Sequence, residues 1–371
     1  MRSLMSLLFC WLAALPAVAA PVAQGNSAGM MYQIEEIASG FEIPWGMAFV
    51  DADTLLVTER RGQLWLVKIE SGHRQQVSGV ATVWANGQGG LLDVAVEPDY
   101  TSDRWIYFTY SKPVQGRGAT TLARAQLNGD QLRNWEDLLV TRSTTGTSRH
   151  FGSRIAFDDA GYVYFGVGDR GERPNGQDLT THAGSILRLH RDGQVPEDNP
   201  FRGRSDVLAE IWSYGHRNPQ GLAYDHRRQQ LWEIEHGPRG GDEINLIRRG
   251  GNYGWPVISY GQEYWGPFDV GEGTHRDGME QPVKYYTPSI APGSLLVYHG
   301  NAFPAWRGDL FSGALKLTHL NRVTLNDKGE AVAEERLLES LNERIRALAE
   351  SPEGWLYLST DSGRILRVRP Q

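Results

Sequence analysis

The stretch 235–256 reads EHGPRGGDEINLIRRGGNYGWP and concentrates oxygen atoms in a glycine-rich turn. Gly237 and Pro238 can present their backbone carbonyls outward, and Asp242 and Glu243 add two carboxylates. Ca²⁺ takes about six to eight oxygen ligands of these kinds. The stretch therefore fits either a calcium site or a solvated acidic turn, and composition alone does not choose between them.

Hydrogen-bond donors gather in a second motif, GHRNPQG (215–221). Arg217 and Asn218 directly precede Pro219, and a proline restricts the residue before it to extended or turn geometry. Two side chains fixed in this way can donate to a carboxylate or to a quinone oxygen. The alternative is a surface turn without a ligand.

Two further polar motifs precede neighbouring repeats of the chain. His150 lies in TSRHFGSR (147–154) and can act as a general base, because the pKa of imidazole is near neutral. Gln88 lies between glycines in NGQGGLLDV (86–94), and its amide can both donate and accept. Most lone histidines are structural, but two polar motifs at equivalent positions favour a shared rim.

Basic side chains recur near the C-terminus. Lys316 ends the motif GALK, and Arg344 and Arg346 lie in NERIRAL (342–348). Residues two apart in a strand point to the same face, so both guanidiniums share one side. On a solvated strand this arrangement would have no function. At a channel rim, the two arginines and Lys316 would attract a multiply anionic ligand. Phosphate-loop, dinucleotide-fold and common hydrolase motifs are absent, so no nucleotide cofactor is expected.

A repeated pattern positions these motifs: an apolar–Ala–apolar strand, an acidic turn, and a second strand rich in Tyr, Trp or Leu. Its six copies span 45–67, 91–111, 153–169, 221–237, 293–315 and 345–369. Alternating apolar and polar residues with Asp, Gly or Pro turns indicate hairpins, and the 43 glycines fit many tight turns. We predict an all-β fold, a six-bladed β-propeller with four-stranded blades, whose ligand binds near the central channel.

The N-terminal residues resemble an export signal. Residues 1–19 combine one arginine, an apolar run and a small-residue stretch, which predicts a cleaved signal peptide and a periplasmic or secreted protein. We expect a flexible leader over 20–31 and a single propeller domain over 32–371. Because the only cysteine, Cys10, lies in the signal peptide, the mature chain would have no disulfide and no thiolate metal site.

Charge and hydropathy exclude two classes of partner. The net charge is −7, with acidic and basic residues interspersed, which argues against a nucleic-acid partner. After the N-terminal segment no apolar run is long enough for a membrane helix, so we expect no integral membrane segment after processing.

Eight motifs together resemble the soluble PQQ-dependent aldose sugar dehydrogenases of the soluble glucose dehydrogenase family. They are PWGMAF, GQGGLLDV, RHFGSR, GHRNPQG, EHGPRGGDEIN, NYGWP, GALK and RIR, and they follow the family's order across residues 44–368. The family fold is a six-bladed propeller, in agreement with the repeat count. The resemblance implies oxidation of aldose sugars at the anomeric carbon to aldonolactones. The hydride would pass to PQQ, and an external quinone, dye or small redox protein would accept the electrons.

The resemblance also implies a role for each matching residue. His150 would take the proton from the anomeric hydroxyl. The residues that would hold PQQ are Gln88, Arg217, Asn218, Lys316, Arg344 and Arg346. The carbonyls of Gly237 and Pro238 would bind the Ca²⁺ that bridges to PQQ, and Glu243 with the Tyr253 carbonyl would bind a second, structural Ca²⁺.

The chain departs from the better-known glucose enzyme at two places. Arg149 stands where that enzyme has an acidic residue beside its catalytic histidine, and the long loops that carry aromatic sugar contacts have no clear counterpart. The sugar preference therefore stays open, as does the choice between monomer and homodimer.

Two other functions remain as alternatives. One is a Ca²⁺-dependent lactonase of the propeller type, in which His150 would activate water. The other is a non-catalytic sugar-binding propeller. Neither alternative gives the basic residues near the C-terminus an evident task.

Overall fold

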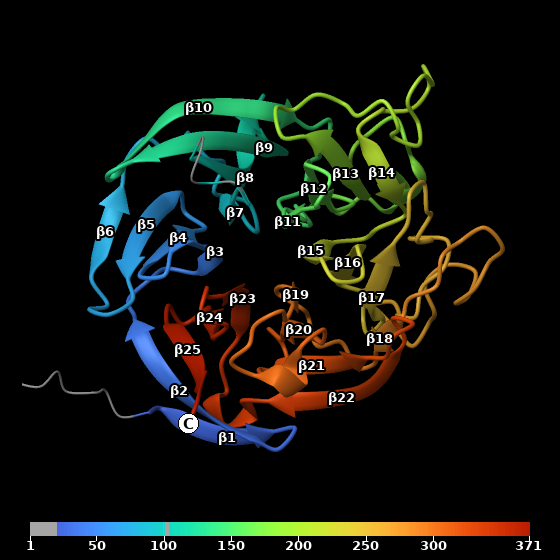
Figure 1. Ribbon diagram of the computed structural model, residues 1–371. Coiled ribbons are helices and arrows are strands. Elements are labelled where there is room, and N and C mark those ends of the chain that lie inside the picture. The colour runs from blue at the N-terminus through green and yellow to red at the C-terminus, as the bar shows by residue number, and fades with distance from the viewer. Residues whose placement is uncertain (1–20, 99, 101–103) are drawn as a thin grey trace, which may run out of the picture.

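The computed structural model describes residues 21–98, 100 and 104–371. These residues form six antiparallel sheets arranged as the blades of a ring around a common centre (Figure 1). The predicted six-bladed β-propeller is therefore confirmed. The predicted signal peptide, 1–19, lies outside the described residues.

The first three blades follow chain order from the innermost strand outward. Blade 1 contains β3 (Pro44–Asp51), β4 (Thr54–Glu59), β5 (Gln63–Lys68) and β6 (Arg74–Val77). Blade 2 contains β7 (Leu91–Val96), β8 (Trp105–Val114), β9 (Arg117–Asn128) and β10 (Gln131–Val140). Blade 3 contains β11 (Ile155–Phe157), β12 (Tyr162–Val167), β13 (Ser185–His190) and β14 (Ile211–Tyr214).

The other three blades complete the ring. Blade 4 contains β15 (Pro219–Asp225), β16 (Gln230–Glu235), β17 (Asp242–Ile247) and β18 (Lys284–Tyr286). Blade 5 contains β19 (Leu296–Val297), β20 (Leu310–Gly313), β21 (Leu320–Leu325) and β22 (Ala331–Leu337). Blade 6 contains β23 (Ile345–Glu350), β24 (Leu356–Thr360), β25 (Ile365–Pro370), β2 (Met30–Ala38) and β1 (Ala23–Ser27).

In the part of the chain that the structure describes, helical structure is limited to short connections. The described 3₁₀ segments are η1 (Arg173–Gln177), η2 (Pro304–Trp306) and η3 (Glu339–Leu341). Among the described residues, no helix has the length and apolar character needed to cross a membrane. The six predicted repeats correspond to the inner strands of the six blades, from β3 and β4 in blade 1 to β23 and β24 in blade 6.

The two ends of the chain close the ring within blade 6. Strand β2 pairs antiparallel with β25, so that Ile34 lies opposite Val368, and β1 adds to the outer edge of β2. The predicted flexible leader over 20–31 is therefore wrong for residues 23–27 and 30–31, which belong to β1 and β2. Their backbone groups are paired across the sheet instead of being left to solvent.

Alternate residues of the inner strands pack against the two neighbouring blades. In β8, Phe108 shares a hydrophobic cluster with Leu56 of blade 1. The adjacent Tyr107 faces blade 3, where its ring centroid lies 5.0 Å from that of Phe157. Successive side chains of a strand point to opposite faces, so a strand buried on both faces is apolar nearly throughout. Similar clusters fill each of the blade interfaces formed by the described residues.

Arg154, directly before β11, links blade 3 to all the other blades at the centre of the channel. Its buried guanidinium donates to Asp93 Oδ1 at 2.9 Å, to the Gln220 carbonyl at 3.1 Å, to the Gly293 carbonyl at 2.6 Å and to the Arg346 carbonyl at 2.9 Å. Its Cζ also lies 4.0 Å from the ring centroid of Trp45. These partners belong to blades 2, 4, 5, 6 and 1 respectively.

Burial opposes the charge on this central pair, because it lowers the pKa of the Arg154 guanidinium and raises the pKa of the Asp93 carboxyl. Arginine nevertheless stays protonated in proteins. The mutual attraction and the carbonyl acceptors compensate the desolvation only while all the partners are in place.

Replacing Arg154 with Met should therefore destabilise the protein strongly. The side chain is similar in length, but Asp93 loses its charged partner and three carbonyls lose their donor. Removing one partner of a buried ion pair typically costs about 3–5 kcal/mol, which urea unfolding measures directly.

The matched control is Arg276→Met, because Arg276 forms an exposed pair with Glu272. That change should alter the free energy of unfolding by less than about 0.5 kcal/mol. A loss below about 1 kcal/mol for Arg154→Met would show that the blades are held together without this contact.

Candidate active site

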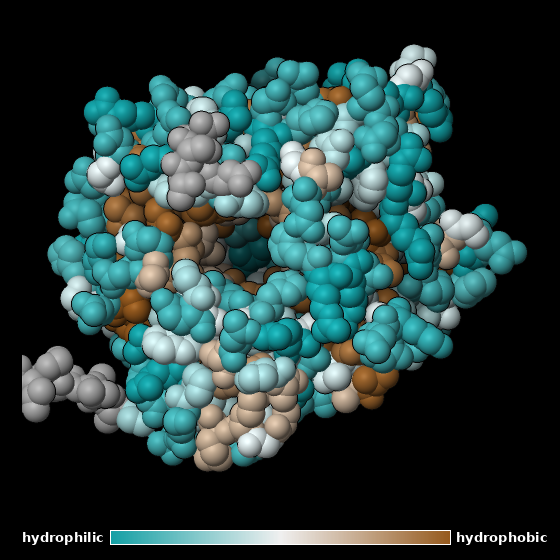
Figure 2. All heavy atoms as spheres, viewed as in Figure 1, coloured by the Kyte–Doolittle hydropathy of each residue, from teal (hydrophilic) through white to brown (hydrophobic). Residues whose placement is uncertain are grey.

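The loops at one end of the channel enclose a cavity of about 210 Å³. Figure 2 shows that the centre of the ring is hollowed on the face that it views. Residues from all six blades or the loops beside them line the cavity: Trp45, Arg60, Gln88, Leu92, Phe151, Gly152, Asn218, Gln220, His236, Ala291, Leu315, Arg344 and Arg346. The cavity therefore brings together side chains from several blades.

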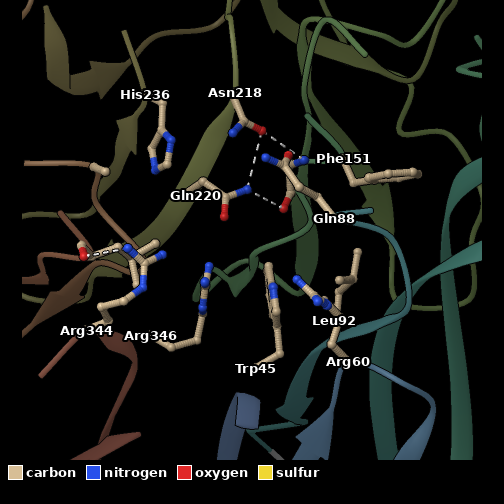
Figure 3. A pocket seen from close by; sticks show the side chains of 13 residues that line it. Trp45, Arg60, Gln88, Leu92, Phe151, Asn218, Gln220, His236, Arg344 and Arg346 are labelled. Carbon is tan, nitrogen blue, oxygen red and sulfur yellow. Dashed lines mark hydrogen bonds between the residues drawn. The ribbon is translucent and has the colours of Figure 1, made fainter. Parts of the chain in front are cut away.

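One wall of the cavity is cationic. Figure 3 shows Arg60, Arg344 and Arg346 along one side, opposite the amide groups and His236. Arg346 Nε and Arg344 Nε donate to the two oxygens of Asp361, at 2.9 and 2.8 Å. Burial, followed by the charge of Arg346, lowers the pKa of Arg60. Arg344 and Arg346 share this one carboxylate and Arg60 adds a third guanidinium, so the wall has a positive charge.

The opposite wall carries neutral polar groups. Asn218 Oδ1 accepts from the Gln220 amide at 3.3 Å, and Gln88 Oε1 accepts from the backbone N–H of His150 at 2.7 Å. Burial lowers the pKa of His236 to about 3, so its ring is neutral and its Nε2–H donates to the Pro292 carbonyl. This wall offers hydrogen bonds without adding charge.

His150 lies beside the cavity, next to Phe151, and forms a pair with Asp169. The imidazole Nδ1 is 2.6 Å from Asp169 Oδ1, and the histidine side chain is only 12% exposed. The carboxylate also accepts from the Trp255 indole at 2.8 Å and from the Gly171 N–H at 2.7 Å. Three contacts therefore fix the position of Asp169.

The electrostatics of the His150–Asp169 pair determine which ring nitrogen of His150 carries a proton. Burial alone would raise the pKa of Asp169, but its bond to His150 and the nearby positive charges lower it overall. Burial lowers the pKa of His150 below its usual value despite the carboxylate. An ionised carboxylate cannot donate, so Nδ1 carries the proton and Nε2 keeps a free lone pair that can accept one.

Arg217 connects the cavity to the predicted calcium ligands. Its Nη1 donates to the Gly237 carbonyl at 2.8 Å, and the Tyr264 hydroxyl donates to the Pro238 carbonyl at 2.8 Å. Both carbonyls therefore face side chains of the site, and each oxygen has a second lone pair for a cation. Asp242 stabilises the turn that contains Gly237, because its buried carboxylate accepts hydrogen bonds from the Gly237 N–H and from the Ser289 hydroxyl.

Glu243 and Tyr253 line a separate small cavity of about 10 Å³, together with Glu235. Burial, followed by the charge of Glu235, raises the pKa values of Glu233 and Glu243 well above the usual range. In the part of the chain that the structure describes, His216, Glu233 and Glu235 place potential metal-ligand atoms within 4.8 Å of one another. The Glu233 Oε1 atom is buried without a hydrogen-bond partner.

Comparison with known proteins identifies the family. The model of the glucose/sorbosone dehydrogenase family matches residues 41–367, nearly the whole propeller. The chain belongs to the glucose/sorbosone dehydrogenase family. It is 40% identical to the aldose sugar dehydrogenase YliI of Escherichia coli over 347 residues, which cover 91% of this chain and 93% of that protein.

Solved structures agree with this assignment. A crystal structure of the E. coli soluble aldose sugar dehydrogenase in its apo-form superposes with a TM-score of 0.87 at 38% identity, covering 92% of this chain and 100% of that one. The PQQ-bound aldose sugar dehydrogenase of Streptomyces coelicolor superposes with a TM-score of 0.75 at 27% identity, covering 92% and 98%. PQQ binding is thus a property of a structural relative of this glucose/sorbosone dehydrogenase family member.

Most of the predicted cofactor-binding residues converge in this family member. Gln88, Asn218, Arg344 and Arg346 line the cavity. Arg217 donates to the Gly237 carbonyl, and the backbone N–H of His150 donates to the side chain of Gln88. Lys316 is exposed and follows the lining residue Leu315, with its backbone N–H bonded to the Ile290 carbonyl. In the described part of the chain, the Lys316 side chain forms no hydrogen bond or ion pair with the other predicted residues.

Several side chains that line the cavity or contact His150 and Asp169 were not indicated by the sequence motifs. They are Trp45, Arg60, Gln220 and His236, which line the cavity, and Asp169 and Trp255, which support His150. Asp169 ends the third repeat, in GVGD, so a search for an acidic partner at repeat ends could have found it. Trp45, Trp255 and His236 lie inside motifs already quoted, but their types alone did not indicate where they point.

Proposed function

We propose that this protein is a periplasmic PQQ-dependent dehydrogenase that oxidises aldoses at the anomeric carbon to aldonolactones. The observation that carries the proposal is the cationic cavity wall beside a histidine held as a base. Family membership and the PQQ-bound relative support it. The predicted signal peptide supports the location.

The residues present fit PQQ, a flat tricarboxylate. Arg60, Arg344 and Arg346 offer charge-assisted bonds along one wall, which suit carboxylates well. Among the described side chains, the Nε of Arg217 is buried without a hydrogen-bond partner, so this edge of the site has a spare donor. Gln88, Asn218 and Lys316 complete the proposed set. When bound, PQQ supplies the acceptor for the hydride that leaves the anomeric carbon.

His150 prepares the sugar for that transfer. Its Nε2 lone pair takes the proton of the anomeric hydroxyl while the C–H bond breaks, so the carbon and oxygen form the carbonyl of the lactone. Asp169 holds the imidazole in the required tautomer and stabilises the imidazolium that forms.

Calcium is the cation that these ligands fit best. The Gly237 and Pro238 carbonyls provide hard oxygen ligands beside Arg217, at the edge of the PQQ cavity. Glu243 and the Tyr253 carbonyl provide the proposed second site, and Glu235 and the unpartnered Glu233 oxygen offer further ligand atoms nearby. Buried carboxylates grouped without a cation are costly, which supports a metal between them.

Ca²⁺ should therefore stabilise the fold even without PQQ. Adding millimolar Ca²⁺ to chelated protein should raise Tm by several degrees, because the ion binds the folded state and relieves repulsion among the blade 4 carboxylates. Glu243→Gln should remove most of this shift, as differential scanning calorimetry measures.

The matched control is Glu272→Gln, which changes an exposed carboxylate paired with Arg276. It should leave the Ca²⁺ effect intact. A Tm that is indifferent to Ca²⁺ in the unchanged protein would contradict the proposed second site.

Replacing His150 with Gln should separate cofactor binding from chemistry. Gln has a similar reach but no basic nitrogen, so turnover should fall at least about a hundredfold, whereas PQQ affinity should change little. Steady-state oxidation of glucose with a dye acceptor measures the first quantity, and a PQQ titration followed by absorbance measures the second.

Asp169→Asn is the companion variant. It removes the charge that stabilises the His150 imidazolium, so the acid limb of kcat/KM should move to lower pH as the rate falls. In the unchanged enzyme this limb should lie below pH 6.5, because burial lowers the pKa of His150. Near-normal turnover in His150→Gln would make His150 a structural residue and refute the mechanism.

A further inference from the structure

A groove between blades 3 and 4 lies apart from the candidate active site. Its volume is about 290 Å³, near the lower end of the range for small-molecule sites. Blade 3 and blade 4, which are neighbours in the ring, both supply its lining (Figure 1). Among the described residues, none that lines the groove also lines the cavity with His236. The groove is therefore a second place where a small ligand could bind.

Three aromatic side chains line this groove. The ring centroids of Tyr164 and Trp212 lie 5.8 Å apart at an interplanar angle of 78°, so the edge of one ring meets the face of the other. Trp212 and Tyr224 are only partly buried, and they pack against the same hydrophobic cluster, which includes Leu231 and Ile247. Trp212 of blade 3 and Tyr224 of blade 4 therefore border one apolar groove, with the Tyr164 ring buried next to Trp212.

The carboxylate of Asp158 adds negative charge to the groove. It is 7% exposed and accepts from the backbone N–H groups of Ala160 and Tyr162, at 3.0 and 2.8 Å, and from the Tyr164 hydroxyl at 3.0 Å. Burial, followed by the charge of Asp158, raises the pKa values of Tyr164 and Tyr224. The carboxylate therefore acts on rings from both blades, while much of its hydrogen-bonding capacity is used within the protein.

The other charges around the groove have partners. The pairs are Arg188–Asp198, Arg248–Glu280, His226–Asp159 and Arg228–Asp225. Among the described basic side chains, none forms an ion pair with Asp158. The Arg188 guanidinium also lies over the Trp212 ring, 4.5 Å from its centroid, so this ring already takes part in one cation–π contact. The groove therefore combines aromatic rings with one carboxylate that has no basic partner.

This combination favours a cation that needs no hydrogen bonds. The faces of Trp and Tyr rings attract cations within about 6 Å of the ring centroid. A primary ammonium or a guanidinium brings several N–H donors, each of which needs an acceptor, and Asp158 already accepts from the backbone and from Tyr164. A quaternary ammonium donates no hydrogen bond, and its methyl groups can pack on apolar side chains such as Leu231. Aromatic cages are the common binding sites for such cations.

We propose that the groove between blades 3 and 4 binds a small quaternary ammonium compound, with the trimethylammonium group between Trp212 and Tyr224 and facing Asp158. This site goes beyond the proposed function, because none of these residues belongs to the set that holds the sugar or PQQ. The ring faces would attract the cation, and the carboxylate would supply the opposite charge.

The test measures the Kd of small probes by saturation-transfer NMR titration of the purified full chain, in an amine-free buffer that contains Ca²⁺. Choline carries the trimethylammonium group, 3,3-dimethylbutan-1-ol is its uncharged analogue of the same shape, and ethanolamine carries a primary ammonium instead. Choline should bind at least about tenfold more tightly than either of the others. The measurement needs neither PQQ nor turnover, so a failure of the proposed function would leave its result unaffected.

Variants place the contact in the groove. Tyr224→Leu removes one ring and should weaken choline binding about tenfold, whereas Tyr224→Phe keeps the ring and should retain most of the affinity. Asp158→Asn should weaken choline binding but leave the Kd of the uncharged analogue within about twofold. The matched control is Tyr285→Leu, because Tyr285 is an exposed tyrosine of β18 that stacks on Tyr260 instead. It should leave choline binding unchanged.

Every other outcome overturns the site. Equal binding of choline and 3,3-dimethylbutan-1-ol would show an apolar groove that does not recognise charge. Ethanolamine binding as tightly as choline would show ordinary ion pairing with a carboxylate. Undiminished choline binding in a folded Tyr224→Leu variant would place the contact elsewhere on the protein, and an absence of saturable choline binding would exclude the site altogether.

Discussion

The guanidinium of Arg154 sets the geometry on which the site depends. It draws together carbonyls, a carboxylate and an aromatic ring from the other five blades, and three of those partners belong to residues that line the cavity: Trp45, Gln220 and Arg346. These contacts therefore join the blades next to residues that line the cavity. A propeller with a weaker centre would leave the cofactor-binding side chains free to move apart with their blades.

Charge is segregated on either side of Arg217. The cavity wall with Arg344 and Arg346 is positive, whereas the interior of blade 4 holds the buried carboxylates Glu233 and Glu235. Arg217 contacts both regions, since its side chain donates to the carbonyl of His236, which lines the cavity, and its backbone N–H donates to Glu235. An anion on one side and a cation on the other would each stabilise this arrangement, which is why PQQ and Ca²⁺ suit it as a pair.

The architecture and much of the site followed from local sequence signals. Strand alternation and acidic turns repeat along the chain, so each copy carries its own evidence, and the motifs around His150, Arg217 and Arg346 were recognisable at their spacing. The pairing of β2 with β25 joins the two ends of the chain, and no local pattern encodes such a contact. Asp169 was missed for the same reason, because its partners His150 and Trp255 are 19 and 86 residues away in the sequence.

The absorption spectrum of the reconstituted protein tests the central claim most directly. Purified protein is mixed with PQQ and Ca²⁺, its spectrum is recorded, and glucose is then added without any other electron acceptor. The account predicts that the protein-bound quinone spectrum is replaced by that of the reduced cofactor, one equivalent for each site. A PQQ spectrum that neither shifts on adding the protein nor changes on adding sugar would contradict it.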